Sequence, residues 1–312
     1  MRNYIIRRLL LVFPMVLAIS FVAFILISFI PSDPAEVALR VNEIVPTPQA
    51  IADMRESLGL NDPLWVRYFH WLQNCLHLDF GHSYINIDRT VYDEIARSLP
   101  VTLKLAAFAF VIVVAVSFPL GILCAVYRDS LFDKSMRVFI FIFTAIPNYW
   151  LALLLMWGLA VYLNLLPTNG ASTWKHYILP AVTLSMTYVS TYIRLIRNSM
   201  LDNMQENYIF YARVRGIKER WVILRHLLPN SIQSTTTALG MSVVQLIAGT
   251  FVIENIFSLP GIGRLCITAI FNRDYPIIQA YILMMGLLFV FCNLLIDIFQ
   301  ALMDPRQRRG VK

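Results

Sequence analysis

The sequence predicts an all-α polytopic membrane protein with about six transmembrane helices and an extracytoplasmic insertion between the first and the second. Two observations favour this class. Of the 312 residues, 58% are apolar and only 14% are charged, whereas about 25% of residues are charged in soluble globular chains. The apolar residues also form long runs, and a helix needs about 20 such residues to cross a hydrocarbon core about 30 Å thick.

Six runs have roughly this length. They cover residues 5–30, 101–127, 138–163, 178–196, 232–256 and 276–303. The first run is longer than the apolar core of a signal peptide, which has about 7–15 residues, and no small-residue cleavage site follows it. We therefore expect the first run to remain in the protein as a transmembrane span.

Basic residues gather on one side of the predicted spans. They lie before the first span, between the second and third, in the segment 194–225 and at the C terminus, whereas the short connections on the opposite side carry only Lys175, Arg264 and Arg273. The positive-inside rule therefore predicts that both termini lie in the cytoplasm. The formal net charge of +7 follows from this bias, and it does not indicate a nucleic-acid partner.

The long segment 31–100 falls on the opposite side and has little apolar continuity. Its middle predicts a helix with Thr47 as N-cap, Pro48 at the first position and Gly59 as the C-terminal stop. A second amphipathic stretch, 63–81, is rich in aromatic residues. Packing against the helix bundle or an interfacial belt is favoured there over a surface for a partner.

Few residues have the type and position that ion-coupled transport or catalysis requires. Lys104, Glu254 and Asp297 lie near the ends of spans and are interpreted as interface or helix-pairing residues. The sequence contains no GxSxG, HExxH or phosphate-binding glycine loop. The four cysteines lack metal-ligand spacing and are interpreted as packing thiols, although a disulfide between Cys75 and Cys266 stays open. We predict no catalytic, cofactor or metal site, so any energy input comes from another chain.

The predicted cytoplasmic segment 197–230 is long for a connection in a bundle, where about 2–8 residues suffice. Its periodicity predicts one helix over 203–215 and a second over 217–227. Gly216 permits a bend between them, and Pro229 is expected to end the second helix. The apolar stripe of the second helix consists of Ile217, Trp221 and Leu224. Two such helices form a compact knob; the alternative is a basic hairpin lying on anionic lipid.

Three positions in this segment follow one another at fixed distances: Ala212, Gly216 and the pair Leu228–Pro229. Their order resembles the later part of the EAA loop in membrane subunits of binding-protein-dependent ABC importers. Phe210 and Tyr211 replace the Glu and first Ala of that motif, and His226 replaces its Ile. Such departures are usual in the dipeptide, oligopeptide and nickel branch of the family.

The resemblance extends over essentially the whole chain. The stretches MRNYIIRRLLLVFPMVLAISFVAFILI, LGLNDPLWVRYFHWLQNCLHLDFGHSY, IPNYWLALLL, LLPTNG, VIENIFSLPGIGRLCITAIFNRDYPIIQ and NLLIDIFQALMDPRQRR resemble the B-type permease of that branch. Within the branch, IENIFSLPGIGRL with AIFNRDYPIIQ is more similar to nickel-type importers than to dipeptide importers.

The resemblance implies the ABC type I importer permease fold in the bacterial cytoplasmic (inner) membrane. The implied parts are a first transmembrane helix at 1–30, an extracytoplasmic insertion at 31–100, a transmembrane core at 101–305 with a coupling loop at 197–230, and a basic cytoplasmic tail at 306–312. The residues of that loop implied to couple to an ATPase are Ala212, Gly216, Ile217, Trp221, His226, Leu228 and Pro229.

The implied partners are a homologous second permease subunit, two cytoplasmic ATPase subunits, which hydrolyse the ATP, and an extracytoplasmic solute-binding protein. The expected function is to form half of the pathway for nickel or another divalent metal ion, carried as a chelate. Short peptides are the alternative substrate, and a stand-alone secondary carrier is the alternative class. No cofactor is expected.

Overall fold

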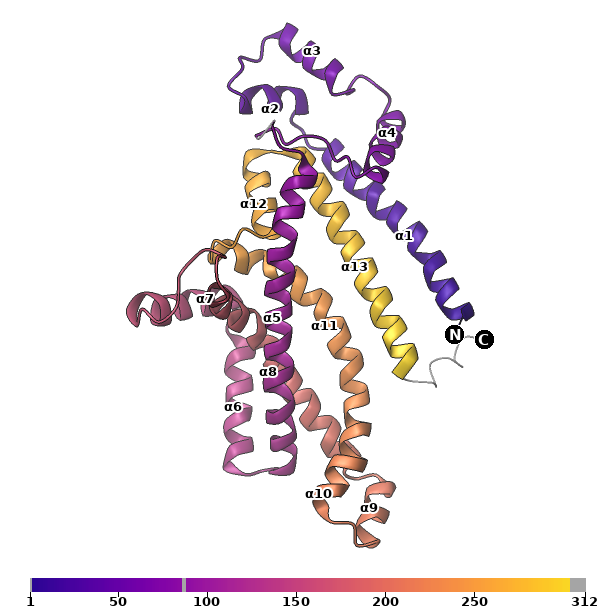
Figure 1. Ribbon diagram of the computed structural model, residues 1–312, viewed down its shortest axis with the longest axis vertical. Coiled ribbons are helices and arrows are strands. Elements are labelled where there is room, and N and C mark those ends of the chain that lie inside the picture. The colour runs from indigo at the N-terminus through magenta and orange to yellow at the C-terminus, as the bar shows by residue number, and fades with distance from the viewer. Residues whose placement is uncertain (1, 86–87, 304–312) are drawn as a thin grey trace. The chain divides into compact units, whose positions relative to one another are not determined.

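A computed structural model describes residues 2–85 and 88–303 of the chain (Figure 1). The regular structure of these residues is helical, and the one β-type pairing among them is a single bridge between His82 and Thr90. The chain divides into two compact units. Unit 1 comprises Met1–Val101 and Pro260–Lys312, and unit 2 comprises Thr102–Leu259.

Within these described residues, four helical segments are long and apolar enough to cross a membrane: Arg8–Ser28, Val91–Val126, Ala238–Ile256 and Tyr275–Phe299. They belong to α1 (Arg2–Ser28), α5 (Val91–Val126), α11 (Leu228–Ile256) and α13 (Tyr275–Met303). These helices confirm four of the predicted spans and the all-α membrane class. Both α5 and α11 begin earlier in the chain than the apolar runs that predicted them.

The predicted span over 138–163 does not form one continuous helix. The chain forms α6 (Leu131–Ala145) and then α7 (Asn148–Leu155), which a π-helical segment extends to Tyr162, and the two parts are bent by 104°. Pro147 causes the break, because a proline disfavours the helical conformation of the residue before it. Ile146 accordingly has the extended angles φ −75° and ψ 124°.

The predicted span over 178–196 forms part of α8 (Ile178–Asn203). Its 26 residues make a helix about 39 Å long, but α8 is not among the helices that are also sufficiently apolar. Thr183, Ser185 and Ser190 of α8 are fully buried in the protein. The described residues therefore contain four apolar spans, or five if the bent pair is one span, and α8 is a long helix of more polar composition.

In unit 1, α13 packs along α1 (Figure 1). The packing is close, because a Cβ atom added at Gly286 of α13 would collide with the Ile19 side chain. Arg8 and Asp297 form an ion pair of 2.6 Å between the same two helices. The interpretation of Asp297 as a helix-pairing residue is thus confirmed.

The predicted outer segment contains three short helices, α2 (Pro34–Val41), α3 (Pro48–Ser57) and α4 (Leu64–Leu76). As predicted, Thr47 caps α3 by accepting a hydrogen bond from the amide of Ala50, and Gly59 follows the helix with φ +62°. Aromatic residues of α4 pack against α1, with Tyr68 in edge contact with Phe21 and Phe24. This contact confirms that α4 packs against a helix of the bundle.

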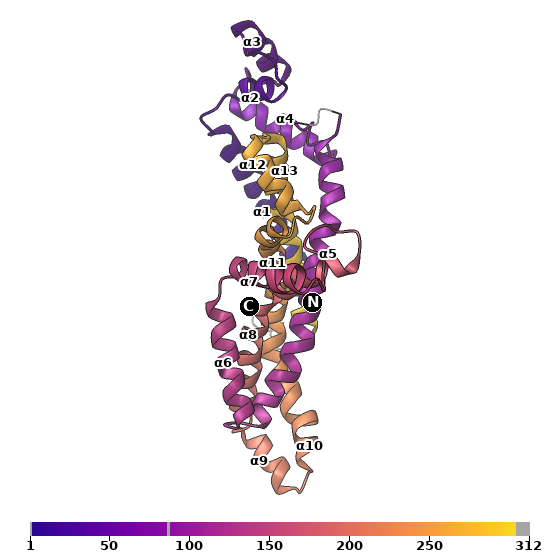
Figure 2. The ribbon, with the colours of Figure 1, turned by 90° about the vertical axis from the view of Figure 1, so that its left-hand side faces the viewer.

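In unit 2, α8 packs against both α11 and α6. The core between them contains Val189, Tyr192 and Ile193 of α8, with Ile140 of α6 and Leu239 of α11. Beyond the ends of α8 and α11 lie α9 (Asn207–Val214) and α10 (Glu219–Trp221) (Figure 2). The segment that contains α9 and α10 is the candidate functional site.

Candidate functional site

Residues 204–227 form a compact knob in which a glycine follows the C-cap of α9. Gly216 has φ +75°, in the left-handed region that favours glycine. The amide of Gly216 donates to the carbonyl of Arg213 at 2.9 Å, and the amide of Ile217 donates to the carbonyl of Ala212 at 3.3 Å. The second bond closes the wide loop typical of a Schellman motif. The bend that was predicted at Gly216 is confirmed.

The second arm of the knob continues into the bundle without a break. After α10 the chain forms a π-helical segment, Val222–Leu227, and α11 begins at Leu228. The prediction that Pro229 ends this helix is wrong, because Pro229 lies in the first turn of α11. Proline lacks an amide hydrogen, and its ring crowds the carbonyl four residues earlier. The wider π-turn just before Pro229 relieves this crowding, so the helix continues.

The inner side of the knob is apolar and anchored. Ile209 and Ala212 of α9 and Val222 and Leu227 of the second arm are buried together with Ala125, Ile196 and Met200. These last three residues belong to α5 and α8. The knob is therefore packed onto the ends of two long helices.

The outer side of the knob exposes large apolar side chains: Phe210, Tyr211, Val214, Trp221 and Leu224. Trp221 and Leu224 belong to the predicted apolar stripe, yet they face outward, since Val222 and Leu227 supply the buried contacts of this arm. An ion pair of 2.6 Å between Arg213 and Glu219 joins the two arms. The guanidinium of Arg220 lies 5.8 Å from the centre of the Trp221 ring.

The residues predicted from the EAA-like spacing thus divide between the two sides. Ala212 is buried, Ile217 and Leu228 are partly buried against the same apolar cluster, and Gly216 forms the bend. Trp221 and Pro229 are exposed, and His226 is partly exposed. The structure brings the first five of these residues in the sequence together in the knob, and Leu228 and Pro229 follow it at the start of α11.

Comparison with known proteins identifies the group to which the chain belongs. The pattern of the family described as "Binding-protein-dependent transport system inner membrane component" matches residues 117–309, and that of its N-terminal region matches residues 1–106. The chain belongs to this family. It is an integral inner-membrane permease subunit of an ABC importer, and it is not itself an enzyme.

Two relatives of the permease are named for different substrates. The metal-staphylopine import system permease protein CntB of Staphylococcus aureus (strain Mu50) is 38% identical over 100% of both chains. The glutathione transport system permease protein GsiC of Escherichia coli (strain K12) is 35% identical over 99% of both chains. These relatives place the permease in the peptide and nickel branch that the sequence predicted.

Solved structures of ABC transporters resemble the permease. The MetNI methionine ABC transporter in an inward-facing conformation has a TM-score of 0.58 at 15% identity, over 67% of this chain and 96% of that chain. An amino acid ABC transporter with histidines has a TM-score of 0.55 at 15% identity, over 67% and 94% of the two chains. At this identity the likeness shows the fold alone, and it confirms the importer permease fold.

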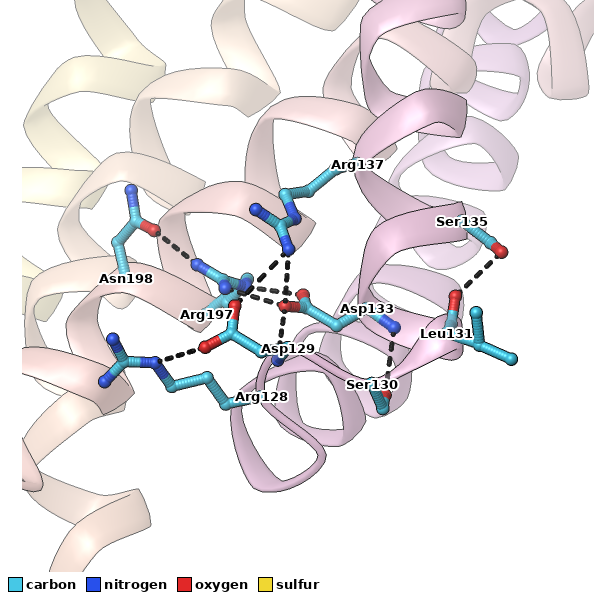
Figure 3. Close-up of polar contacts among 9 residues, drawn as sticks. All are labelled: Arg128, Asp129, Ser130, Leu131, Asp133, Ser135, Arg137, Arg197 and Asn198. Carbon is cyan, nitrogen blue, oxygen red and sulfur yellow. Dashed lines mark hydrogen bonds and ion pairs between the residues drawn. The ribbon is translucent and has the colours of Figure 1, made fainter.

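A buried ion pair near the knob was not predicted from the sequence. The carboxylate of Asp133 on α6 accepts bonds of 2.7 and 2.8 Å from Nε and Nη2 of Arg197 on α8 (Figure 3). The Asp133 side chain is fully buried, and that of Arg197 is 14% exposed. Arg137 approaches both Asp129 and Asp133, at 3.4 and 3.5 Å. The pair fixes the turn between α5 and α6 to α8.

Other buried carboxylates also join segments of the permease that are distant in the sequence. Glu254 is fully buried and accepts a bond of 2.6 Å from the hydroxyl of Thr102, which confirms its interpretation as a helix-pairing residue. Asp274 is fully buried and accepts bonds from the Ser83 hydroxyl and the Tyr84 amide. Burial raises the pKa of Asp274.

The described part of the chain contains no group of three or more histidine, cysteine, aspartate or glutamate residues placed to hold a metal ion. All four cysteines are free thiols, so the disulfide between Cys75 and Cys266 that the sequence left open does not form. Burial raises the pKa of Cys75 to about 12, and its thiol is therefore protonated at neutral pH.

Proposed function

We propose that the permease forms half of the translocation pathway for nickel or another divalent metal ion, carried as a chelate. The observation that supports this substrate is the 38% identity, over the full length of both chains, to a permease named for metal-staphylopine import. The chelator supplies the metal's ligands in this proposal. Short peptides are the alternative substrate, favoured by the 35% identity to a permease named for glutathione transport.

The knob is the proposed contact with a cytoplasmic ATPase subunit. In support, its inner side is packed onto α5 and α8, and its outer side exposes Phe210, Trp221 and Leu224. Exposed apolar and aromatic side chains mark protein interaction surfaces. The proposed assembly contains this permease, a homologous second permease, two ATPase subunits and an extracytoplasmic solute-binding protein. Closure of the ATPases moves the knobs and, with them, the attached helices.

The proposed topology places both termini and the knob in the cytoplasm, because the basic residues are concentrated in these segments. The test is a reporter that functions only in the cytoplasm. We expect activity when it is fused to the C terminus and none when it is inserted at Val45, between α2 and α3. The reverse pattern, or activity at both sites, contradicts this topology.

The substrate is tested by uptake into cells that contain the complete importer and no other nickel transporter. The probes are radioactive nickel bound to histidine, radioactive nickel as the free ion, and a radiolabelled dipeptide. We expect ATP-dependent uptake of the nickel–histidine complex, and little uptake of the free ion or the dipeptide. Uptake of the dipeptide alone favours the peptide alternative and contradicts the metal proposal.

The coupling surface is tested by Trp221→Ala and Leu224→Ala. We expect both variants to insert in the membrane and to pair with the second permease, but to retain less ATPase after affinity purification. Leu131→Ala is the matched control, because Leu131 is an exposed apolar residue of the same unit outside the knob. Equal ATPase retention by all three variants contradicts a role of this surface in ATPase binding.

A further inference from the structure

A basic groove lies beside the buried ion pair in unit 2, between one face of α6 and one face of α8. Its cavity has a volume of about 410 Å³, and its charged lining residues are Arg137 of α6 and Arg194 and Arg197 of α8. Ile140, Phe141 and Ala145 form an apolar wall on α6. The groove is separate from the proposed coupling surface, which lies on the knob.

The basic side chains of the groove are not all neutralised by neighbouring carboxylates. Arg197 is engaged by the buried Asp133 in a two-bond ion pair. The bonds of Arg137 to Asp129 and Asp133 are longer, at 3.4 and 3.5 Å, than the 2.7–2.9 Å of strong charge-assisted bonds. The Arg194 side chain is exposed and has no ion pair among the residues that the structure describes. Arg137 and Arg194 are therefore available to an anion.

The polarity of the groove changes along α6. Arg137 lies near the start of the helix, whereas Phe141 and Ala145 follow one and two turns later. At 1.5 Å per residue, the apolar wall extends about 12 Å beyond the arginine. A free inorganic anion needs only the basic end of such a groove. A phospholipid presents a phosphate first and hydrocarbon behind it, in the same order as the lining of the groove.

We infer that the groove binds an anionic phospholipid, with its phosphate diester between Arg137 and Arg194 and an acyl chain along Phe141 and Ala145. Basic pockets between transmembrane helices at a membrane surface bind such headgroups. The proposed topology places the groove in the cytoplasmic leaflet, and the lipid then bridges α6 and α8. Ile196 and Met200, on the same stretch of α8, pack under the knob, so the lipid stabilises the base of the coupling element.

The test uses the assembled importer in nanodiscs of phosphatidylcholine, to which phosphatidylglycerol is added. Binding is measured by native mass spectrometry and by displacement of a fluorescent phosphatidylglycerol. The variants are Arg137→Gln, Arg194→Gln and the double variant. Lys134→Gln is the matched control, since Lys134 is an exposed cation of the same helix that does not line the cavity. Arg197 is left intact because it neutralises the buried Asp133.

We expect one tightly bound phosphatidylglycerol per permease in the wild type and in Lys134→Gln. The affinity falls about fivefold in each single variant and about twenty-fivefold in the double variant, the loss expected for one and two basic residues at an anionic surface. Melting temperatures in phosphatidylcholine alone, unchanged from wild type, show that the variants are folded. Phosphatidylcholine does not displace the probe, and neither does millimolar inorganic phosphate.

Three results overturn the inference. Equal affinity in the double variant and in Lys134→Gln places the lipid elsewhere. Full displacement by inorganic phosphate shows a site for free anions. Efficient crosslinking of Phe141→Cys to the second permease, together with no bound phosphatidylglycerol, shows that a subunit covers the groove. Coupling through the knob is measured separately by ATPase retention, so failure of the lipid site and failure of the proposed function are distinguishable.

Discussion

The bend at Gly216 gives the most direct test of the knob, because its cost depends on the backbone alone. Gly216 has φ +75°, and a Cβ atom added there meets no other atom within 4 Å. A side chain at this position therefore causes no collision. A left-handed conformation costs about 1–2 kcal/mol for an ordinary L-residue, less for asparagine, and more for a β-branched residue.

These energies predict a graded series of variants. Gly216→Asn should be close to wild type. Gly216→Ala should lose about 1–2 kcal/mol, which is a factor of about 5–30 in the population of the bent knob, and Gly216→Val should lose more. Gly216→Pro should be most severe, since proline fixes φ near −65° and removes the amide that bonds to the Arg213 carbonyl at 2.9 Å.

The assay is affinity purification of the tagged permease from cells that express the whole importer, with the retained ATPase quantified for each variant. Membrane insertion and pairing with the second permease should stay normal, because unit 2 keeps its apolar core. Lys218→Ala is the control, since Lys218 is exposed beside the bend. Equal retention for the Asn, Ala and Val variants would refute the argument that this bend positions the knob. A loss with Lys218→Ala alone would assign the contact to the charge.

Three further predictions test other parts of the molecule. Asp133→Ala leaves Arg197 without its buried partner and should destabilise the fold by about 3–5 kcal/mol. Adding Arg197→Met to this variant should recover most of the lost melting temperature. A double variant that melts no higher than Asp133→Ala contradicts the ion-pair argument. Uptake should survive replacement by alanine of the three outer histidines, and complete loss in an assembled importer would show that the insertion handles metal. These residues are His70, His77 and His82. Burial raises the pKa of Asp274, so its protonated form stabilises the fold at low pH, and this stability is lost as the pH rises through the folded pKa. In Asp274→Asn the melting temperature should no longer fall over this pH range. A melting temperature that depends on pH as in the wild type would contradict this role of Asp274.

Local signals were sufficient to predict much of the fold. The apolar runs predicted α1, α5, α11 and α13, because lipid requires a long and nearly uninterrupted apolar surface. The cap at Thr47 and the glycine bend at Gly216 were predicted because both depend on residues only a few positions apart. The knob could therefore be located from the sequence, with its bend at the correct residue.

The features that the sequence did not predict depend on context. The apolar run over 138–163 conceals the break at Pro147, since hydropathy does not report the direction of the chain. Pro229 was predicted to end a helix, but the helix continues through it because a π-helical segment lies just before it. The outward direction of Trp221 depends on which neighbouring side chains reach the core. The pair of Asp133 and Arg197 joins residues 64 positions apart, so no local pattern marks it.

The position of Arg197 explains how a movement of the knob can reach the rest of unit 2. Arg197 and Ile196 are neighbours on α8, so their side chains point in different directions from the helix. Arg197 binds Asp133 of α6, whereas Ile196 packs into the apolar cluster under the knob. The end of α8 is thus held on one side by an ion pair and on the other by the knob. Because packed interfaces switch between discrete arrangements and do not deform continuously, a force on the knob should move α8, α6 and the turn after α5 as one body.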